Sequence, residues 1–369
     1  MQFQHVIRRA GPCGAMFAFA LSLLVAGSTV GNADSKPGIG TLEAGPIAIT
    51  ATPVTSFNRA GSNENHFGKL DFRGGLVLSA PDNKNFGGWS GLVLDPDGKL
   101  FSSISDSGVW LTGKINYAGG APSAISDARI GPLLALNGNP IKRNRDRDAE
   151  ALALLSGSAH NGSMLVAFEQ NARFARYDVT AEGFSPSRGI IEKPKGASAM
   201  RRNQGFEAMT VMKGGPHKGS IVALSERLYD SARNHTGWIQ TGSGWDTFHI
   251  TNIGDFDLTD IASLDDGTFF VLERRFRWLE GVKMRIRRFS AEALKAGATA
   301  NGETLIEADL EYQIDNMEGL ALTRGPAGET ILTLISDDNF NHFLQRTILL
   351  QFALKDKVQD AATKNRLQR

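Results

Sequence analysis

The sequence predicts an all-β fold, a β-propeller of five or six four-stranded blades whose ring is closed by an N-terminal strand. Three observations predict it. One pattern recurs along the chain at intervals typical of a propeller blade, and each interval holds about four strand-like runs. The last interval is also short of strands, whereas two strand-like runs precede the first one.

The recurring pattern is an acid, a small residue and then alternating apolar residues. Four copies carry the acid at Glu150, Glu207, Asp260 and Glu318, and Ser90 takes its place in a weaker fifth copy. Positions 90, 150, 207, 260 and 318 are 60, 57, 53 and 58 residues apart. After each copy an apolar run ends in a second acid, and these acids are Asp106, Glu169, Glu226, Glu273 and Asp337.

The second interval shows all four expected strands, EALALL, SMLVAF, FARYDV and RGIIEK. DPDG at 95–98 and LDDG at 264–267 predict hairpin turns, because Asp-Gly tolerates the positive φ that such turns require. An N-terminal strand beside TILLQFAL would close a ring of five blades, whereas a separate blade at 45–79 would make six. The alternative is two unrelated all-β domains.

The first 33 residues are expected to be a signal peptide, because Arg8 and Arg9 precede an apolar run and then small residues. The run is too short for a comfortable membrane span, so we expect no stable span after cleavage. The general secretory and twin-arginine routes both stay open. We therefore expect a periplasmic or secreted protein with a propeller domain at 34–355 and a polar tail at 356–369.

Composition excludes two classes of function. The chain has 40 basic and 39 acidic residues, a balance that argues against a nucleic-acid surface. Its only cysteine, Cys13, lies in the expected leader, so the mature chain has no disulfide and no thiolate nucleophile.

The repeated acids predict a metal site. In a propeller the first strand of each blade lines the central channel, so these carboxylates would meet at one mouth, where they need cations. Calcium is the expected ion, because it takes six to eight oxygen ligands in loose geometry. The candidate ligands are Glu150, Glu207, Glu226, Asp260, Glu273, Glu318, Asp337 and Asp338.

Arginines stand beside several of these acids, and Arg202, Arg227 and Arg274 are the candidates for binding an anionic substrate. A guanidinium can bind a phosphate or a carboxylate through two parallel hydrogen bonds. The alternative is that these arginines only form salt bridges between blades.

Motifs along most of the chain resemble the phytase-like family, also described as esterase-like activity of phytase and common among exported bacterial proteins. The matching stretches are GGWSGL at 87–92, ISDSG at 104–108, DAEAL at 148–152, NQGFEAM at 203–209, LERRF at 272–276, NMEGLAL at 316–322 and ISDDNF at 335–340. The resemblance implies calcium-dependent hydrolysis of a phosphate ester or diester, and hence a phosphorylated small-molecule substrate. It favours Glu207, Glu318 and Asp337 as catalytic residues.

Two other functions stay open. Lactonase propellers hold one calcium with Glu, Asn and Asp, and Glu318, Asn316 and Asp338 could supply such a set. A propeller that binds a ligand or a cell-envelope partner without catalysis is the alternative from another class.

Overall fold

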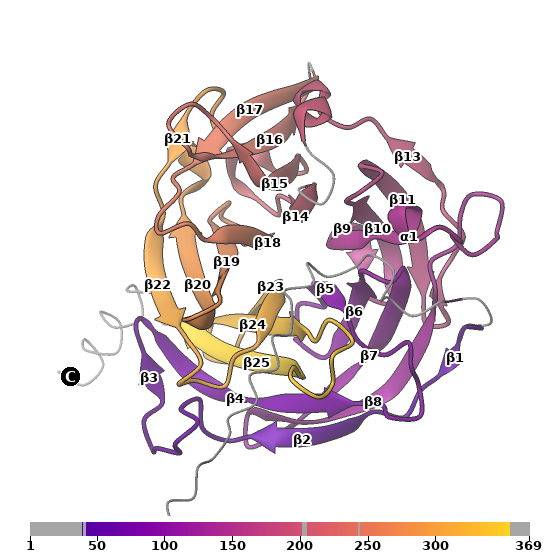
Figure 1. Cartoon of the computed structure of the whole chain (residues 1–369), viewed down its shortest axis with the longest axis vertical. Coiled ribbons are helices and arrows are strands. Elements are labelled where there is room, and N and C mark those ends of the chain that lie inside the picture. Colours follow the sequence, from indigo (N-terminus) through magenta and orange to yellow (C-terminus); the bar gives the residue numbers. More distant parts are fainter. Residues whose placement is uncertain (1–38, 40–41, 201–204, 243, 355–369) are drawn as a thin grey trace, which may run out of the picture. The chain divides into compact units, whose positions relative to one another are not determined.

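The computed structural model describes residues 39, 42–200, 205–242 and 244–354. Within them five sheets lie in a ring, so the chain is a five-bladed β-propeller (Figure 1). The predicted fold class is confirmed, and the number of blades is five rather than six. The expected signal peptide at 1–33 and the tail at 356–369 lie outside the described residues. No helix of the described part is long and apolar enough to cross a membrane.

Blades one to three follow one another along the chain, each starting with its innermost strand. Blade one is β5 (Trp89–Leu94), β6 (Leu100–Ser105), β7 (Val109–Ala118) and β8 (Ala121–Pro132), with β1 (Gly45–Pro46) paired to β8. Blade two is β9 (Ala149–Ser158), β10 (Asn161–Phe168), β11 (Arg173–Thr180), and β12 (Gly183–Phe184) and β13 (Gly189–Ile191), which both pair with β11. Blade three is β14 (Phe206–Val211), β15 (Ile221–Tyr229), β16 (His235–Thr241) and β17 (Gly244–Ile250), with β21 (Thr299–Ala300) at its edge.

Blades four and five complete the ring. Blade four is β18 (Asp257–Ser263), β19 (Phe269–Arg277), β20 (Gly281–Phe289) and β22 (Glu303–Ala308). Blade five is β23 (Asn316–Arg324), β24 (Thr330–Asp337), β25 (Thr347–Leu354) and β4 (Leu70–Ser79), with β2 (Thr50–Val54) and β3 (His66–Phe67) paired to β4. The short helices are α1 (Asn144–Arg147), η1 (Lys195–Ala199), η2 (Gly215–His217) and η3 (Ala291–Ala293).

The N-terminal strand β4 closes the ring as predicted. It pairs antiparallel with β25 from Thr347↔Leu78 to Ala353↔Asp71, so a strand from the start of the domain becomes the fourth strand of the last blade. Residues 45–79 therefore form no sixth blade. Closing the ring in this way pairs the edge that β25 would otherwise expose.

The Asp-Gly turns form where the sequence predicted them. Gly98 and Gly267 adopt φ of +72° and +85°, a conformation that L side chains avoid, and each amide donates to the carbonyl three residues earlier. These turns connect the first and second strands of blades one and four.

Apolar side chains pack between neighbouring blades and hold them together. Leu272 and Met284 of blade four share one buried cluster with Leu332 and Phe352 of blade five. Because such interiors are packed as densely as organic crystals, the innermost strands are held in fixed positions. Side chains at the ends of these strands are therefore placed reproducibly around the central axis.

The innermost strands differ in polarity between their two ends. Beyond the first few residues, apolar side chains from all five strands, among them Leu92, Leu152 and Leu320, line a cavity of only about 50 Å³. A space of this size has room for a few water molecules at most. The polar and charged side chains considered below lie at the other end, where the innermost strands begin.

We call that end the mouth face. In an antiparallel blade the innermost strand begins where the second strand ends, so the hairpins from second to third strands lie there as well. The connections from one blade to the next also reach this face. The remaining hairpins lie on the opposite face.

Candidate metal and substrate site at the channel mouth

Each innermost strand has a β-bulge at its second or third residue. In blade three, for example, Phe206 pairs with Ser225 and Ala208 pairs with Leu224, which leaves Glu207 as the extra residue. The same register shift occurs in all five blades, and the extra residues are Ser90, Glu150, Glu207, Thr259 and Glu318. A bulge redirects a side chain, so one side chain per blade occupies an equivalent position at the mouth.

The strand register of blade four shows that the sequence pattern identified the wrong residue as the counterpart of Glu207. Leu258 pairs with Glu273 and Asp260 pairs with Leu272, so Thr259, not Asp260, is the counterpart of Glu207. Asp260 is 1% exposed, and its carboxylate accepts the backbone N–H groups of Ile261 and of Leu320 in blade five, at 2.8 and 2.6 Å. It joins two blades and belongs to neither carboxylate group at the mouth.

A second mouth position lies on each second strand, one residue after the partner of the residue that precedes the bulge. It holds Asp106, Glu169, Glu226, Arg274 and Asp337. In blade four the acid of this series is therefore replaced by Arg274, and Glu273 lies one residue before it. Glu273 is fully buried, and the guanidinium groups of Arg285 and Arg287 both pair with it. Glu273, which the sequence predicts as a metal ligand, is therefore a structural ion-pair partner of these two arginines.

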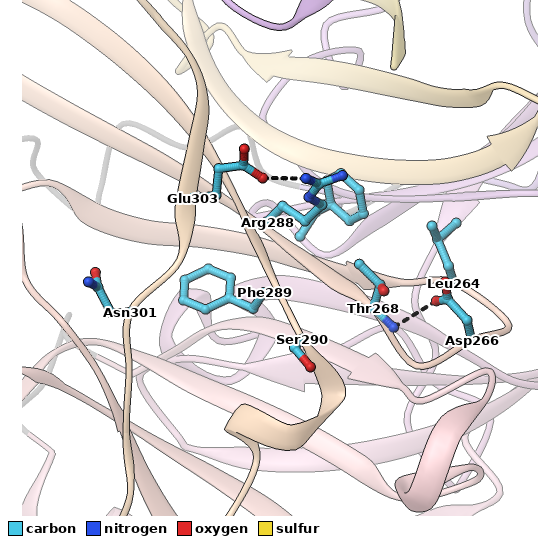
Figure 2. Close-up of a pocket in the computed structure, with 9 residues that line it drawn as sticks. Leu264, Asp266, Thr268, Arg288, Phe289, Ser290, Asn301 and Glu303 are labelled. Atoms are coloured by element: carbon cyan, nitrogen blue, oxygen red, sulfur yellow. Dashed lines mark hydrogen bonds and ion pairs between the residues drawn. The ribbon is translucent and has the colours of Figure 1, made fainter. Parts of the chain in front are cut away.

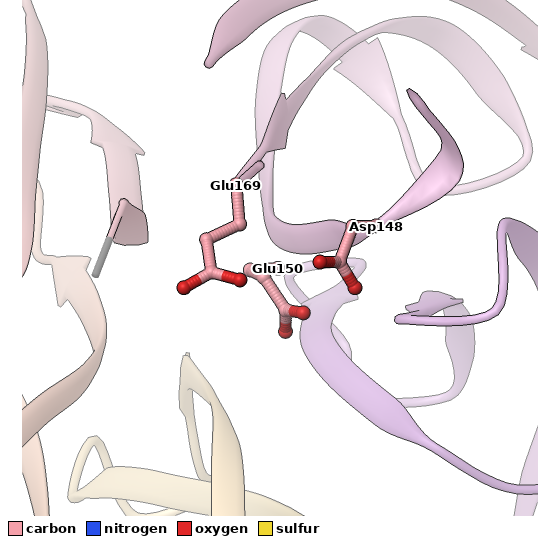
Figure 3. Close-up of side chains that lie close together, drawn as sticks. All are labelled: Asp148, Glu150 and Glu169. Carbon is pink, nitrogen blue, oxygen red and sulfur yellow. The ribbon is translucent and has the colours of Figure 1, made fainter. Parts of the chain in front are cut away.

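The acids of blades two and three converge in two groups of three carboxylates. Asp148, Glu150 and Glu169 form one group, and their side chains point toward one another in Figure 3. Glu169 also belongs to the second group, with Glu207 and Glu226. Within each group the oxygen atoms lie within 4.8 Å of one another, close enough for one hard cation to contact all three.

The pKa values show that these carboxylates are crowded. Burial raises the pKa of Glu169 to about 8, with the Asp148 charge adding to the effect. Burial also raises the pKa of Glu207 well above its usual range, and the charges of Glu169 and Glu226 contribute. Glu169 and Glu207 are hydrogen-bonded to each other, which requires a proton on one of them. Without a cation, this pair holds a proton near neutral pH.

Glu226 has a more balanced environment. Burial and the Asp257 charge raise its pKa to about 7, while Arg227 and Arg274 act in the opposite direction. Its Oε1 lies 3.5 Å from Arg227 and 3.6 Å from Arg274. The Arg227 Nε and Nη2 donate to the two oxygens of Asp257 at 2.9 and 2.5 Å, so Arg227 is chiefly an ion-pair partner of that acid.

Arg274 lies between the acids of blades three and five. It donates to Asn316 Oδ1 at 2.8 Å, and its Nη1 lies 3.5 Å from Glu318. Its Nε is buried and has no hydrogen-bond partner among the described residues. Burial opposes its charge, but the nearby carboxylates raise its pKa, so Arg274 is a cation held among the mouth acids.

Blade five places Glu318 and Asp337 outside both carboxylate groups. Asn316 Nδ2 donates to Glu318 at 2.8 Å and to Asp337 at 3.3 Å, which connects the two acids. Burial and the Glu318 charge raise the pKa of Asp337 well above its usual range. The protonated form of Asp337 is therefore favoured by its surroundings.

Asp338 has its oxygens occupied by the protein. It accepts from the backbone N–H groups of Gly88 and Phe340, both at 3.1 Å, and from the Thr347 hydroxyl at 2.9 Å. Of the lactonase set, Glu318 and Asn316 are hydrogen-bonded to each other at 2.8 Å, and Asp338 fixes the loop that follows β24. Arg202, a predicted substrate ligand, lies outside the described residues.

The prediction of site residues omitted Asp148 and Glu169. Glu169 carried a signal, because it ends the apolar run of its repeat. Asp148 had none beyond its place two residues before Glu150. Its Oδ2 accepts from Gln170 Nε2 at 2.8 Å, and a neighbour of this kind orients a metal ligand.

Other pockets lie apart from these acids. One of about 360 Å³ is lined by Asp266, Thr268, Ser290 and the Arg288–Glu303 ion pair (Figure 2). Thr268 and Ser290 belong to hairpins of the opposite face, so this pocket shares nothing with the mouth.

Comparisons with known proteins agree with a propeller of this family. The family model "Phytase-like: Esterase-like activity of phytase" matches residues 84–340. No curated protein matches the sequence. Among solved structures, the chain is similar to the endo-arabinase from Bacteroides thetaiotaomicron, with a TM-score of 0.43, 10% identity, and coverage of 73% of this chain and 94% of that one. It is also similar to the WD40 domain of coronin from Toxoplasma gondii, with a TM-score of 0.39, 8% identity, and coverage of 86% and 89%.

TM-scores of this size carry no inference about activity. The family match alone spans more than half of the chain, and it includes both carboxylate groups and Arg274. The chain therefore belongs to the phytase-like family.

Proposed function

We propose that this protein is exported and hydrolyses phosphate esters or diesters with the aid of calcium at the mouth of its propeller. One observation carries the proposal: Glu169 belongs to two groups of three carboxylates, and in each group one oxygen of every member lies within 4.8 Å of the others. Among the described residues neither Glu169 nor Glu207 pairs with a lysine or an arginine, although each is largely removed from water. Buried charges of this kind are stabilised by pairing or by metal coordination.

The donor set fits calcium. It consists only of carboxylate oxygens, from Asp148, Glu150, Glu169, Glu207 and Glu226, and this ligand chemistry suits a hard divalent cation rather than zinc. Calcium bound there would polarise the phosphoryl oxygens of a substrate and activate a water molecule. Its positive charge would also remove the need for the proton that Glu169 and Glu207 share.

Arg274 is the proposed ligand of the substrate phosphate. Its position among acids keeps it charged, and its Nε has a free donor. A guanidinium binds phosphate oxygens through charge-assisted hydrogen bonds. Glu318 and Asn316 hold the other side of the guanidinium, at 3.5 and 2.8 Å, so they are positioning residues for Arg274.

Asp337 is the proposed general acid. Burial and the Glu318 charge raise its pKa, which favours the protonated form, and a protonated carboxyl can donate its proton to the oxygen of the departing alcohol. Water supplies the oxygen of the new phosphate group, and the alcohol leaves with the proton from Asp337. The carboxylate that remains recovers a proton from solvent.

The test is a hydrolysis assay on the chelator-treated mature protein with and without added Ca²⁺. Substrates are bis(p-nitrophenyl) phosphate, p-nitrophenyl phosphate and a sugar lactone. We expect calcium-dependent turnover of a phosphate ester, lost in Glu169→Gln and Arg274→Gln and retained in the matched control Glu292→Gln, whose carboxylate is exposed in a hairpin of the opposite face. Calcium binding without turnover of any ester would contradict the hydrolase and support a non-catalytic propeller that binds calcium.

A further inference from the structure

Large exposed apolar side chains are concentrated on the mouth face. The described part of the chain has nine of them, and eight lie in connections that reach this face: Leu136, Ile253, Phe276, Trp278, Leu279, Leu310, Phe343 and Leu344. The ninth, Ile190, lies on an outer strand of blade two. Single exposed apolar residues are common, but a concentration on one face indicates an interaction surface.

The most exposed of these side chains form two tips on neighbouring blades. The β19–β20 hairpin of blade four carries Phe276, Trp278 and Leu279, which are 62%, 81% and 94% exposed. The loop between β24 and β25 in blade five carries Phe343 and Leu344, which are 94% and 72% exposed. Blades four and five lie side by side in the ring (Figure 1). We call these five residues the apolar collar.

The blade-four tip is held by a regular strand pair. Beyond Arg274 the pairing continues through Arg275↔Lys283, Phe276↔Val282 and Arg277↔Gly281. The tip residues therefore stand on a paired ribbon that extends past the mouth acids, and their exposure follows from the strand register.

The same hairpin carries positive charge. Arg275, Arg277 and Lys283 surround the single carboxylate of Glu280, at 2.6, 3.1 and 3.6 Å. Arg277 also lies 3.5 Å from Asp255. Three cations against these two acids leave the base of the apolar tip with a net positive charge.

Aromatic and aliphatic tips above basic residues match the surface of an anionic lipid bilayer. Tryptophan and phenylalanine partition to the boundary between headgroups and acyl chains, and arginine and lysine stems place their charges among the lipid phosphates. A protein partner would instead be expected to seat such anchors in a compact, closely packed patch. The collar consists of two separate projecting tips on adjacent blades, which suits a broad, deformable surface.

We propose that the apolar collar docks the protein on anionic lipid bilayers, with Trp278 and Leu279 inserted into the interfacial layer. In this orientation the mouth carboxylates and Arg274 face the headgroups. The docking does not depend on catalysis, so it can be tested whether or not the mouth hydrolyses phosphate esters.

The test is co-sedimentation of the mature protein with vesicles of phosphatidylcholine, with and without phosphatidylglycerol. We expect binding to the anionic vesicles that weakens with added salt. Partitioning should fall by roughly tenfold or more in the double variant Trp278→Ser/Leu279→Ser, and it should be unchanged in Ile190→Ser, the control on the outer strand of blade two. All variants change exposed residues, so their thermal midpoints should match the parent protein.

Tryptophan fluorescence gives a second readout. Trp278 is 81% exposed, Trp89, Trp110 and Trp238 are buried, and Trp245 is half-buried beside the β16–β17 hairpin of the opposite face. Brominated lipids should therefore quench Trp278. Trp278→Phe should still bind but lose the quenching. The proposal is overturned by absence of binding to anionic vesicles, by equal loss of binding in Ile190→Ser, or by unquenched Trp278 in the bound protein. A dimer that forms through the collar and dissociates in the double variant, without vesicle binding, would also overturn it.

Discussion

Blade three presents Glu207 and Glu226 at its two mouth positions, whereas blade four presents Thr259 and Arg274 at the same positions. The strand register is equivalent, so the two blades differ in charge and not in backbone geometry. Arg274 lies near Glu226 of blade three and Glu318 of blade five. Arg274 of blade four therefore offsets part of the negative charge of both neighbouring blades, whereas the acids of blades two and three form the two groups of three carboxylates.

The difference separates two uses of buried acids. In blade four, Glu273 pairs with Arg285 and Arg287, and Asp260 accepts two backbone N–H groups. Both acids are satisfied by the protein itself. At blades two and three, Glu169 accepts the Gly205 N–H at 3.3 Å, and within the described residues neither Glu169 nor Glu207 pairs with a lysine or an arginine. The contacts of an acid therefore indicate whether it has a structural role or binds a metal, whereas its position in the repeat does not.

The largest expected effect is on stability in blade four. Glu273→Ala leaves two buried guanidinium groups without their anion, so we expect the free energy of unfolding to fall by about 3–5 kcal/mol. Urea unfolding at neutral pH measures it. Glu303→Gln breaks the half-exposed pairs with Lys69 and Arg288 and should cost less than about 1 kcal/mol. Equal costs for the two variants would contradict the assignment of Glu273 to structure.

The second effect is a pH dependence that originates at blades two and three. Glu169 and Glu226 have pKa values raised from 4.5 to about 8 and about 7, so the folded protein binds protons more tightly than the unfolded chain does. Their contribution to stability is intact below the unfolded pKa of 4.5 and is lost as the pH rises through 7 and 8.

We therefore expect the calcium-free protein to lose about 2–4 kcal/mol of stability between pH 5 and pH 8. Saturating Ca²⁺ should remove most of this loss. Unfolding curves at several pH values with chelator or with Ca²⁺ measure both, and a calcium-free protein that gains stability over this range would contradict the shared proton.

A smaller effect is expected for Arg274→Gln, which removes the cation between the two sides of the mouth. Without it, the pKa values of Glu226 and Glu207 should rise, and stability at pH 8 should fall by about 1–3 kcal/mol relative to pH 5. Arg274→Lys keeps the charge and should recover most of the stability but not phosphate binding, because an ammonium lacks the planar fork. Inorganic phosphate binding, followed by calorimetry, distinguishes the two variants.

The smallest predicted effect concerns Gln170, whose amide donates to Asp148. Gln170→Ala should weaken calcium binding by about tenfold, the lower end of what a residue that orients a metal ligand contributes. The thermal midpoint without calcium should hardly change. Affinities from calcium titrations of both proteins provide the measurement, and unchanged affinity would remove Asp148 from the ligand set.

The sequence predicted the blades well because each repeat carries its own strand pattern. It identified the copies at Glu150, Glu207 and Glu318, and it identified the N-terminal strand that closes the ring. It misplaced blade four by one residue, since TDIAS offers an acid at 260 while the bulge falls on Thr259. Which residue bulges depends on pairing with the second strand, and a single sequence does not show that pairing.

The one-residue shift in blade four also explains why the sequence predicts Glu273 as a metal ligand at the mouth. LERRF places an acid and a base side by side, and only the register shows that the base occupies the mouth position. The opposing arginines of Glu273 lie in β20, 12 and 14 residues further along the chain, at a distance where sequence spacing gives no indication of an ion pair. Asp148 and Glu169 are likewise brought together by the fold, and their spacing in the sequence does not show it.

The most direct test of the central claim is calorimetric titration of chelator-treated protein with Ca²⁺ near pH 7, in two buffers that differ in ionisation enthalpy. The carboxylates of blades two and three must give up their shared proton to bind the ion. We predict calcium binding accompanied by proton release in the parent protein, and loss of binding in Glu169→Gln. Absence of binding, or unchanged binding in Glu169→Gln, would contradict the account.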